Sequence, residues 1–161
     1  MEESIDPRNG DAASLQMTRN MVDEILNRFE IARRRAEDVS PLSLAYVGDC
    51  VYELILRTCL IERAEGSAKT HTREGSRLAK APTQAAMMHA ILSDLDPDEE
   101  AAYRRGRNAS PGHTARSATV AEYRVATGFE ALVGWLYLQE KTERIYELIK
   151  LGWDRTGVWQ K

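Results

Sequence analysis

The segment that most constrains the fold is Val125–Leu138, VATGFEALVGWLYL, in which Glu130 is the only side chain of a charged residue type. A segment that is apolar on all sides is typical of a largely buried helix. Removing an unpaired carboxylate from water costs several kcal/mol, so folding alone would favour Gln or Leu at this position. We therefore take Glu130 as a candidate metal ligand. A solvated glutamate and an ion pair with Arg124 are the alternatives.

A second apolar segment, Pro41–Leu56, carries only Asp49 and Glu53 as charged residues. On a helical wheel both acids lie at the edge of the apolar arc, between core and water. A carboxylate there can be oriented by packing and still reach a ligand. Two apolar helices that each carry an acid suggest a site between them, with Asp49 and Glu130 as its ligands. A partly exposed polar residue is the alternative for Asp49, and a solvated or ion-paired side chain is favoured for Glu53.

Paired carboxylates from two helices favour Mg²⁺, a hard cation that takes few protein oxygens and keeps several waters. Zinc is disfavoured because the three histidines, His71, His89 and His113, stand far apart. Neither an H-E-x-x-H nor a C-x-x-C spacing occurs. We expect Mg²⁺ as the cofactor, held by Asp49 and Glu130.

The apolar periodicity predicts an all-α fold with no strand and no internal repeat. Ser40 before Pro41 and Asp96 before Pro97 predict capped helix starts, and Gly66–Ser67 predicts a break. A loop is expected over 108–114. The expected helices are Thr18–Ala36, Pro41–Arg63, Thr70–Ala79, Thr83–Leu95, Pro97–Arg107, Thr119–Leu138 and Thr142–Trp153.

A chain of 161 residues that is 43% hydrophobic can bury one ordinary core without disulfides. We expect an N-terminal extension over 1–38, flexible to about residue 17 and then helical, followed by one compact domain over 39–161. Cys50 and Cys59 are interpreted as reduced core residues. Neither a signal peptide nor a membrane span is evident, which predicts a cytoplasmic protein with no membrane partner.

The net charge of −3 argues against nucleic-acid binding through bulk charge. Basic residues are nevertheless concentrated between Arg104 and Arg124, where one acid, Glu122, faces five arginines and His113. A second group is spaced at helical intervals, so that its four cations share one face. A solvated face is the alternative for this second group. The candidate RNA-binding residues are Arg104, Arg105, Arg107, Asn108, Lys69, Arg73, Arg77 and Lys80.

Three segments of the chain resemble the catalytic domain of ribonuclease III, and most closely the small Mini-ribonuclease III subfamily. The segments are LAYVGDCVYE (44–53), RGRNAS (105–110) and EYRVATGFEALVGWLYL (122–138). The resemblance implies that the family's catalytic aspartate is Asp49 and that its metal-binding glutamate is Glu130. Leu42, Ala45 and Thr127 occupy positions where the larger enzymes carry further acids. The resemblance thus implies an all-α ribonuclease III-like domain with a reduced set of carboxylates.

The resemblance also implies a function. Mg²⁺-dependent hydrolysis of double-stranded RNA would leave 5′-phosphate and 3′-hydroxyl ends, and the family's substrate is the 23S ribosomal RNA precursor. A two-fold homodimer is implied because one site cuts one strand. Since 23 residues follow Leu138, we expect no double-stranded RNA-binding domain there, and a ribosomal protein is a candidate helper.

Two other functions stay open. A catalytically inert module of the same fold could bind structured RNA during ribosome assembly, as the missing carboxylates would allow. A helical protein-interaction domain would show no salt-dependent affinity for RNA. The small-residue strip Thr127, Ala131 and Gly134 could meet either a partner protomer or the chain's own core.

Overall fold

The computed structural model describes residues 21–63, 66–111 and 118–159, which fall into two units separated after Arg34. The first unit contains helix α2, Met21–Arg28. The prediction of a helix to Ala36 is wrong, because the chain leaves the helix at Glu30, whose φ of 55° is left-handed. The Ile31 amide then donates to the Leu26 carbonyl at 2.9 Å, which closes the helix end. The predicted flexible start lies outside the described residues.

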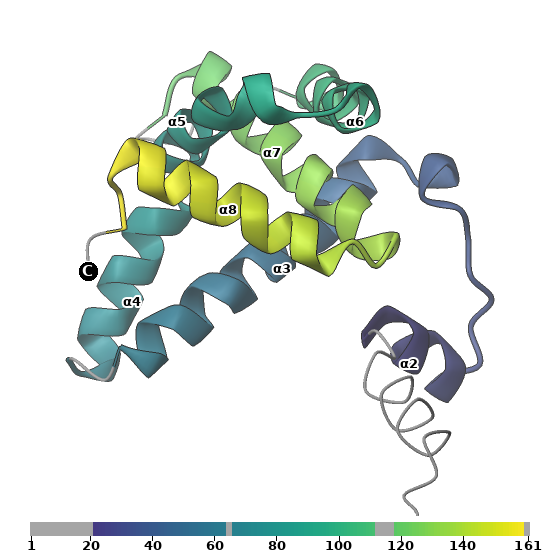
Figure 1. The fold of residues 1–161 in the computed structure, drawn as a ribbon, viewed down its shortest axis with the longest axis horizontal. Helices are drawn as coiled ribbons and strands as arrows, with labels where there is room; N and C mark the ends of the chain where they lie inside the picture. The colour runs from purple at the N-terminus through teal and green to yellow at the C-terminus, as the bar shows by residue number, and fades with distance from the viewer. Residues whose placement is uncertain (1–20, 64–65, 112–117, 160–161) are drawn as a thin grey trace, which may run out of the picture. The chain divides into compact units, whose positions relative to one another are not determined.

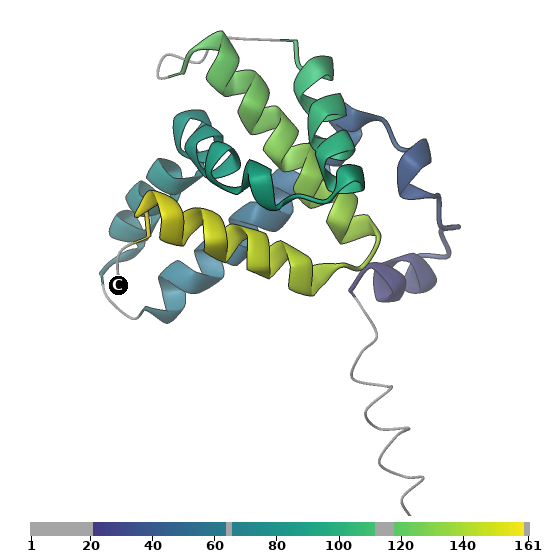
Figure 2. The same ribbon diagram turned by 45° about the horizontal axis from the view of Figure 1, so that its top comes forward.

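The second unit is built from six α-helices, and its described residues contain no strand, which confirms the predicted all-α fold. Helix α7 contacts α3, α5, α6 and α8, and Figures 1 and 2 show it running between them. Two short 3₁₀ turns, Ala36–Asp38 and Leu92–Asp94, complete the unit. The helices are α3 (Pro41–Glu62), α4 (Ala68–Ala79), α5 (Ala81–Ile91), α6 (Pro97–Ala109), α7 (Val120–Leu138) and α8 (Thr142–Thr156).

Side-chain caps fix the helix starts that bear on the site. The Ser40 hydroxyl accepts from the Ser43 amide at 3.2 Å, as the Ser-Pro pair predicts. Thr119 and Glu122 form a capping box at the start of α7. Asp96 and Glu99 form another at the start of α6. Helix α6 extends to Ala109, so the predicted loop begins later than Asn108, and residues 112–117 of that region lie outside the described residues.

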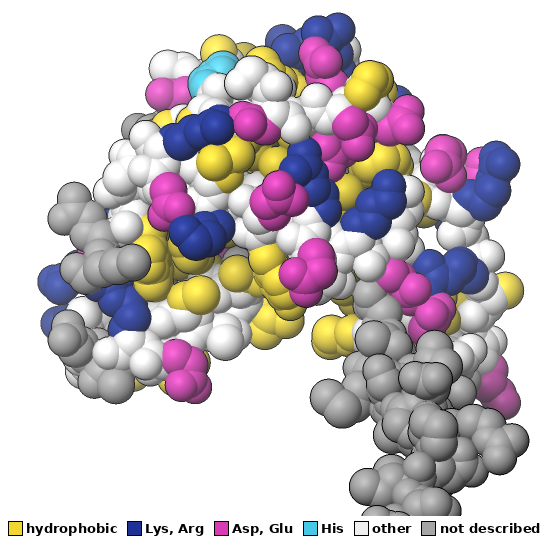
Figure 3. Space-filling model, viewed as in Figure 1, with side chains coloured by type: hydrophobic (Ala, Val, Ile, Leu, Met, Phe, Trp, Pro, Cys, Tyr) yellow, Lys and Arg dark blue, Asp and Glu magenta, His cyan; other side chains and the backbone are white. Residues whose placement is uncertain are grey.

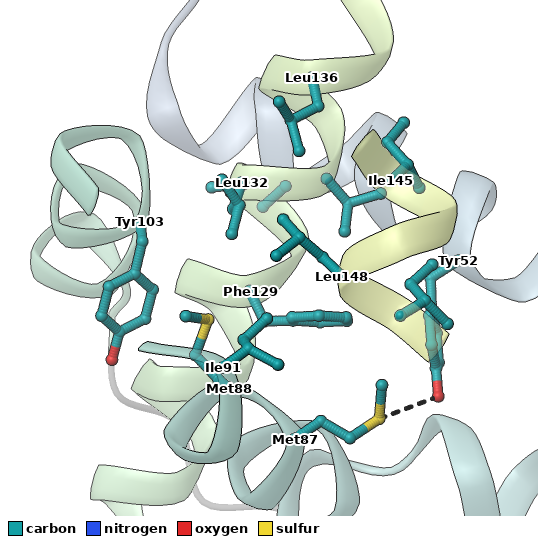
Figure 4. Packing of buried hydrophobic residues seen from close by; sticks show 14 of the residues in the cluster. Tyr52, Met87, Met88, Ile91, Tyr103, Phe129, Leu132, Leu136, Ile145 and Leu148 are labelled. Atoms are coloured by element: carbon teal, nitrogen blue, oxygen red, sulfur yellow. Dashed lines mark hydrogen bonds between the residues drawn. The ribbon is translucent and has the colours of Figure 1, made fainter. Parts of the chain in front are cut away.

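The core gathers around the middle of α7, as Figure 4 shows. Phe129 is fully buried and packs edge-on against Tyr52 of α3, with ring centroids 5.4 Å apart. The Tyr52 hydroxyl donates to the Leu78 carbonyl at 2.9 Å and lies 3.4 Å from the Met87 sulfur, which ties α3 to α4 and α5. The polar atom of this central ring is therefore satisfied without water.

Glycines allow α3 and α7 to cross at very short range. A Cβ on Gly48 would lie 1.8 Å from the Glu130 carbonyl oxygen, and one on Gly134 would lie 1.9 Å from the Leu44 carbonyl oxygen. Any larger side chain at either position would push the backbones apart. The crossing places Asp49, the neighbour of Gly48, beside the α7 turn that carries Glu130.

The two cysteines differ from the sequence interpretation. Both are free, but Cys50 is exposed and Cys59 is partly buried, so neither belongs fully to the core. Cys50 stands in an apolar stretch of α3, where the sequence pattern does not distinguish buried from exposed positions. Within the described residues, every helix is too short or too polar to cross a membrane.

Candidate active site

A cavity of about 380 Å³ opens where α3, α5 and α7 meet. It receives Asp49 from α3 and Glu130 from α7, so the structure brings together the two acids that the sequence singled out. The junction of α4 and α5 closes the third side with Lys80 and Gln84. The remaining lining residues are Ala79, Ala81, Tyr123, Ala126 and Thr127.

Burial and nearby negative charge disfavour the ionisation of both carboxyl groups. The pKa of Glu130 is raised to about 8, first because burial penalises the charged form and second because the negative charge of Asp49 lies nearby. Burial also raises the pKa of Asp49, with a further contribution from Glu53, while Arg57 acts in the opposite direction. A bound cation would relieve both penalties at once, and this is the electrostatic signature of a metal site.

Glu53 lies outside the cavity lining and forms an ion pair with Arg57, one turn further along α3. This agrees with its interpretation as an ion-paired side chain. Arg124, the alternative partner of Glu130, is exposed. Among the described residues, no group of three or more histidines, cysteines or acids is placed to hold a metal. The protein therefore offers two carboxylates, a donor set that suits Mg²⁺ with most of its hydration retained.

Three side chains stand where the resemblance implies that acids have been replaced, and they differ in burial and hydrogen bonding. Ala45 is buried, and Leu42 is exposed. Thr127 is buried, and its hydroxyl lies 3.0 Å from the Tyr123 carbonyl and 3.2 Å from the Ser110 hydroxyl. Because its hydrogen bonds are made within the protein, Thr127 shapes the cavity wall, and Asp49 and Glu130 are the acidic groups of the lining.

Helix α4 carries one predicted group of basic residues. Lys69 and Arg73 are exposed, and Lys80 at the end of the helix lines the cavity. Arg77 is instead engaged by the protein: its guanidinium pairs with Glu74 at 2.9 Å and donates to the Val158 carbonyl at 3.1 Å. At the C-terminal end of α4, the basic face therefore reaches the cavity, where Lys80 lies in the same lining as Asp49 and Glu130.

Helix α6 carries the other predicted group. Arg105 and Asn108 are exposed, Arg104 pairs with Glu100, and Arg107 lies over the Tyr103 ring with its guanidinium carbon 5.4 Å from the centroid. The end of α6 reaches the site through the Ser110–Thr127 hydrogen bond. His113 and Arg116 lie outside the described residues.

The small-residue strip of α7 packs within the chain. Gly134 meets α3 at the Leu44 carbonyl, while Ala131 is fully buried against Gly106 of α6. Of the two alternatives left open by the sequence, the structure therefore selects the chain's own core.

Gln84 is the site residue that sequence reasoning missed. It lies within the apolar run APTQAAMMHAI and is fully buried. An isolated polar side chain in an apolar helix is the same signal that identified Glu130. The sequence does contain this signal, but an uncharged amide in an apolar helix is a weaker indication of a site than a carboxylate.

Comparisons with known proteins agree with this geometry. The Ribonuclease III domain model matches residues 42–141. The chain is 42% identical over 114 residues to Mini-ribonuclease 3 of Symbiobacterium thermophilum, covering 71% of this chain and 88% of that protein. It is 41% identical over 118 residues to Mini-ribonuclease 3 of Enterococcus faecalis, covering 72% and 89%.

A solved structure has a similar fold. The crystal structure of protein FN1578 from Fusobacterium nucleatum superposes with a TM-score of 0.65 at 32% identity, covering 70% of this chain and 90% of that one. Residues 42–141, which the Ribonuclease III domain model matches, include both carboxylates, the α3–α7 crossing and both basic helices. On this combined evidence the chain belongs to the ribonuclease III family, within its Mini-ribonuclease 3 group.

Proposed function

We propose that this ribonuclease III-type endoribonuclease uses Mg²⁺, held by Asp49 and Glu130, to cut double-stranded RNA. The observation that carries the proposal is the meeting of these two carboxylates in one cavity that Lys80 also lines. Carboxylates attract the cation, and the ammonium group attracts the phosphate of the substrate. A cavity that bears both kinds of group suits phosphodiester chemistry.

When bound, Mg²⁺ supplies an activated water and stabilises negative charge on the phosphate. The residues of the chain contribute binding and orientation. Asp49 and Glu130, each fixed on a rigid helix, hold the ion, and Lys80 stands at the rim where a phosphate would approach. Hydrolysis adds water across the bond between phosphorus and the 3′ oxygen, which leaves 5′-phosphate and 3′-hydroxyl ends.

We propose recognition of the duplex by shape and backbone rather than by sequence. The deep, narrow major groove of A-form RNA is poorly read by side chains. The exposed cations Lys69 and Arg73 lie on α4, the helix that leads to Lys80, and Arg105 lies on α6; all three suit contact with phosphates. The paired ends of the 23S ribosomal RNA precursor are the substrate that we propose, in the cytoplasm, and a ribosomal protein is a candidate partner.

A homodimer follows from the need to cut two strands with one carboxylate pair in each chain. Apolar side chains on α3 support it, because Leu42, Tyr46 and Leu54 are 45%, 81% and 56% exposed at spacings of four or eight residues. Figure 3 shows hydrophobic side chains at the surface between α3 and α8, where Leu54 and Tyr146 line an apolar hollow. This stripe is the face that we assign to the second protomer.

The direct test is incubation of the protein with precursor 23S ribosomal RNA in Mg²⁺ or EDTA, with fragment ends read on a sequencing gel. Discrete cuts in paired stems are expected in Mg²⁺ only. The Asp49→Asn variant should bind RNA without cutting it. Glu130→Gln should cut slowly, with partial recovery at higher Mg²⁺. Loss of helicity in either variant would contradict the assignment of these acids as ligands.

An inert RNA-binding module is the second candidate function. It is favoured by one observation, namely that Leu42, Ala45 and Thr127 stand where the larger enzymes carry further acids. Such a module would bind the precursor RNA with salt-dependent affinity and leave it intact in Mg²⁺. The cleavage assay therefore separates the two functions.

A further inference from the structure

Gln84 has a buried amide whose hydrogen bonds are not made by the protein. Its side chain is fully buried, and within the described residues neither Nε2 nor Oε1 has a hydrogen-bond partner. Each buried polar group left in this state costs about 1–3 kcal/mol. An amide that carries this cost twice needs a partner that the described part of the chain does not supply.

Packing does not explain an amide at this position. Apart from Thr83, the other buried residues of α5 are apolar, namely Ala85, Met87, Met88 and Ile91. A methionine has nearly the same length and shape as glutamine and carries no comparable desolvation cost. The Trp135 Nε1 also has no hydrogen-bond partner among the residues that the structure describes. The large Trp135 ring contributes to the hydrophobic core by itself, whereas the amide is the whole end of the Gln84 side chain.

The position of Gln84 points to the missing partner. Its side chain lines the same cavity as Asp49 and Glu130, one helical turn after Lys80. It lies close enough to the Glu130 carboxyl to act on it, although no hydrogen bond of acceptable geometry forms between them. The unsatisfied amide and the carboxylate pair thus share one space.

We propose that Gln84 is a positioning residue of the metal site. Its amide becomes satisfied when the cavity is loaded, by donating to the Glu130 carboxylate and by accepting from water that hydrates the cation. An outer hydrogen-bond partner of this kind orients a ligand and raises the affinity for the ion. The inference rests on the proposed function, since it assigns Gln84 to the same Mg²⁺ site.

The test compares the wild-type protein with Gln84→Met, using Mg²⁺ alone and no RNA. Calorimetric titration should give Mg²⁺ affinity weakened by about 10–100-fold, as for other residues that support metal ligands. Thermal unfolding in EDTA should give a melting temperature equal to or above that of the wild type, because an unsatisfied amide has been removed. Gln84→Leu repeats the test if the Met variant is poorly folded.

Thr83→Val is the matched control. Thr83 is buried next to Gln84 on α5, but its hydroxyl donates to the Arg77 carbonyl at 2.8 Å. The control should lower the melting temperature in EDTA and leave Mg²⁺ affinity unchanged. If the Gln84 variants behave in the same way, Gln84 is structural and this inference is overturned while the proposed function stands. If the wild-type protein binds no Mg²⁺, both are overturned.

Discussion

At the scale of single residues, Glu130 lowers the stability of the metal-free protein. Its carboxyl group has a pKa of about 8, chiefly because burial penalises the charge. A raised carboxyl pKa means that the folded state binds a proton over a pH range in which the unfolded chain has released it. Between about pH 4.5 and pH 8, stability therefore falls as pH rises.

We accordingly predict that Glu130→Gln unfolds at a higher temperature than the wild type in EDTA at pH 8.5. The amide keeps the size of the side chain and removes the buried charge. The two proteins should converge below pH 4.5, where Glu130 is protonated in both the folded and the unfolded state. Differential scanning calorimetry from pH 4 to pH 9 measures the gap.

Saturating Mg²⁺ should reverse this order, because the wild-type protein, with both carboxylates, binds the ion more tightly and is stabilised more by it. Asp98→Asn is a suitable control, since Asp98 is an exposed acid in the first turn of α6. That substitution should leave both the pH dependence and the effect of Mg²⁺ unchanged. A Glu130→Gln protein that is less stable than wild type in EDTA at pH 8.5 would contradict the buried-charge argument.

At the scale of elements, the α3–α7 crossing sets the distance between the two acids. We predict that Gly48→Ala lowers the free energy of unfolding by about 3 kcal/mol or more and abolishes cleavage. The added methyl group would lie 1.8 Å from the Glu130 carbonyl oxygen, so one helix must shift. Urea unfolding and the cleavage assay measure the two effects.

Gly75→Ala is the matched control for this substitution. Gly75 also lies inside a helix, but a Cβ there would meet the Leu60 side chain at an ordinary 3.6 Å. Alanine should therefore be neutral or stabilise the protein by up to about 1 kcal/mol, as helix propensity predicts. Equal effects of Gly48→Ala and Gly75→Ala would show that the close crossing is not the cause.

The basic residues of α6 give a prediction for RNA binding. Arg105→Ala should weaken binding to duplex RNA and lower the slope of log affinity against log salt by about one unit, the share of one phosphate contact. Lys150→Ala, on α8 and paired with Asp154, should leave that slope unchanged. Fluorescence anisotropy in Ca²⁺ at several salt concentrations measures the affinity for RNA and its salt slope for both variants. A slope unaltered by Arg105→Ala would remove α6 from the RNA-binding surface.

The sequence predicts where a helix begins better than it predicts which other helices that helix packs against. Ser40, Asp96 and Thr119 act locally, since each cap bonds to an amide three residues later, and all three helices begin where expected. The end of α2 escapes prediction because it depends on a left-handed residue, Glu30, that is not a glycine. Such a turn has no clear signature in composition or periodicity.

The site shows the same division between local and long-range information. Asp49 and Glu130 are conspicuous because each is a charge within an apolar helix. Their meeting depends on Gly48 and Gly134, whose role follows only from the crossing of two helices that are far apart in the sequence. Lys80 was predicted as one cation of a helical face, and its place in the cavity wall results from how α4 and α5 are joined.

At the scale of the whole molecule, the exposed stripe of α3 is where a second protomer would bind. The exposed side chains of Leu42, Tyr46 and Leu54 leave apolar area in water that a symmetric contact would bury. We predict that Tyr46→Asp converts a dimer into a monomer in sedimentation equilibrium, because the stripe would then carry a charge that must be desolvated. With one site left on each particle, duplex RNA should receive nicks in place of double-strand cuts.

Val120→Asp, an equally polar change at a 40% exposed position on α7, should keep the dimer. A wild-type protein that sediments as a monomer while cutting both strands would contradict the assignment of this stripe.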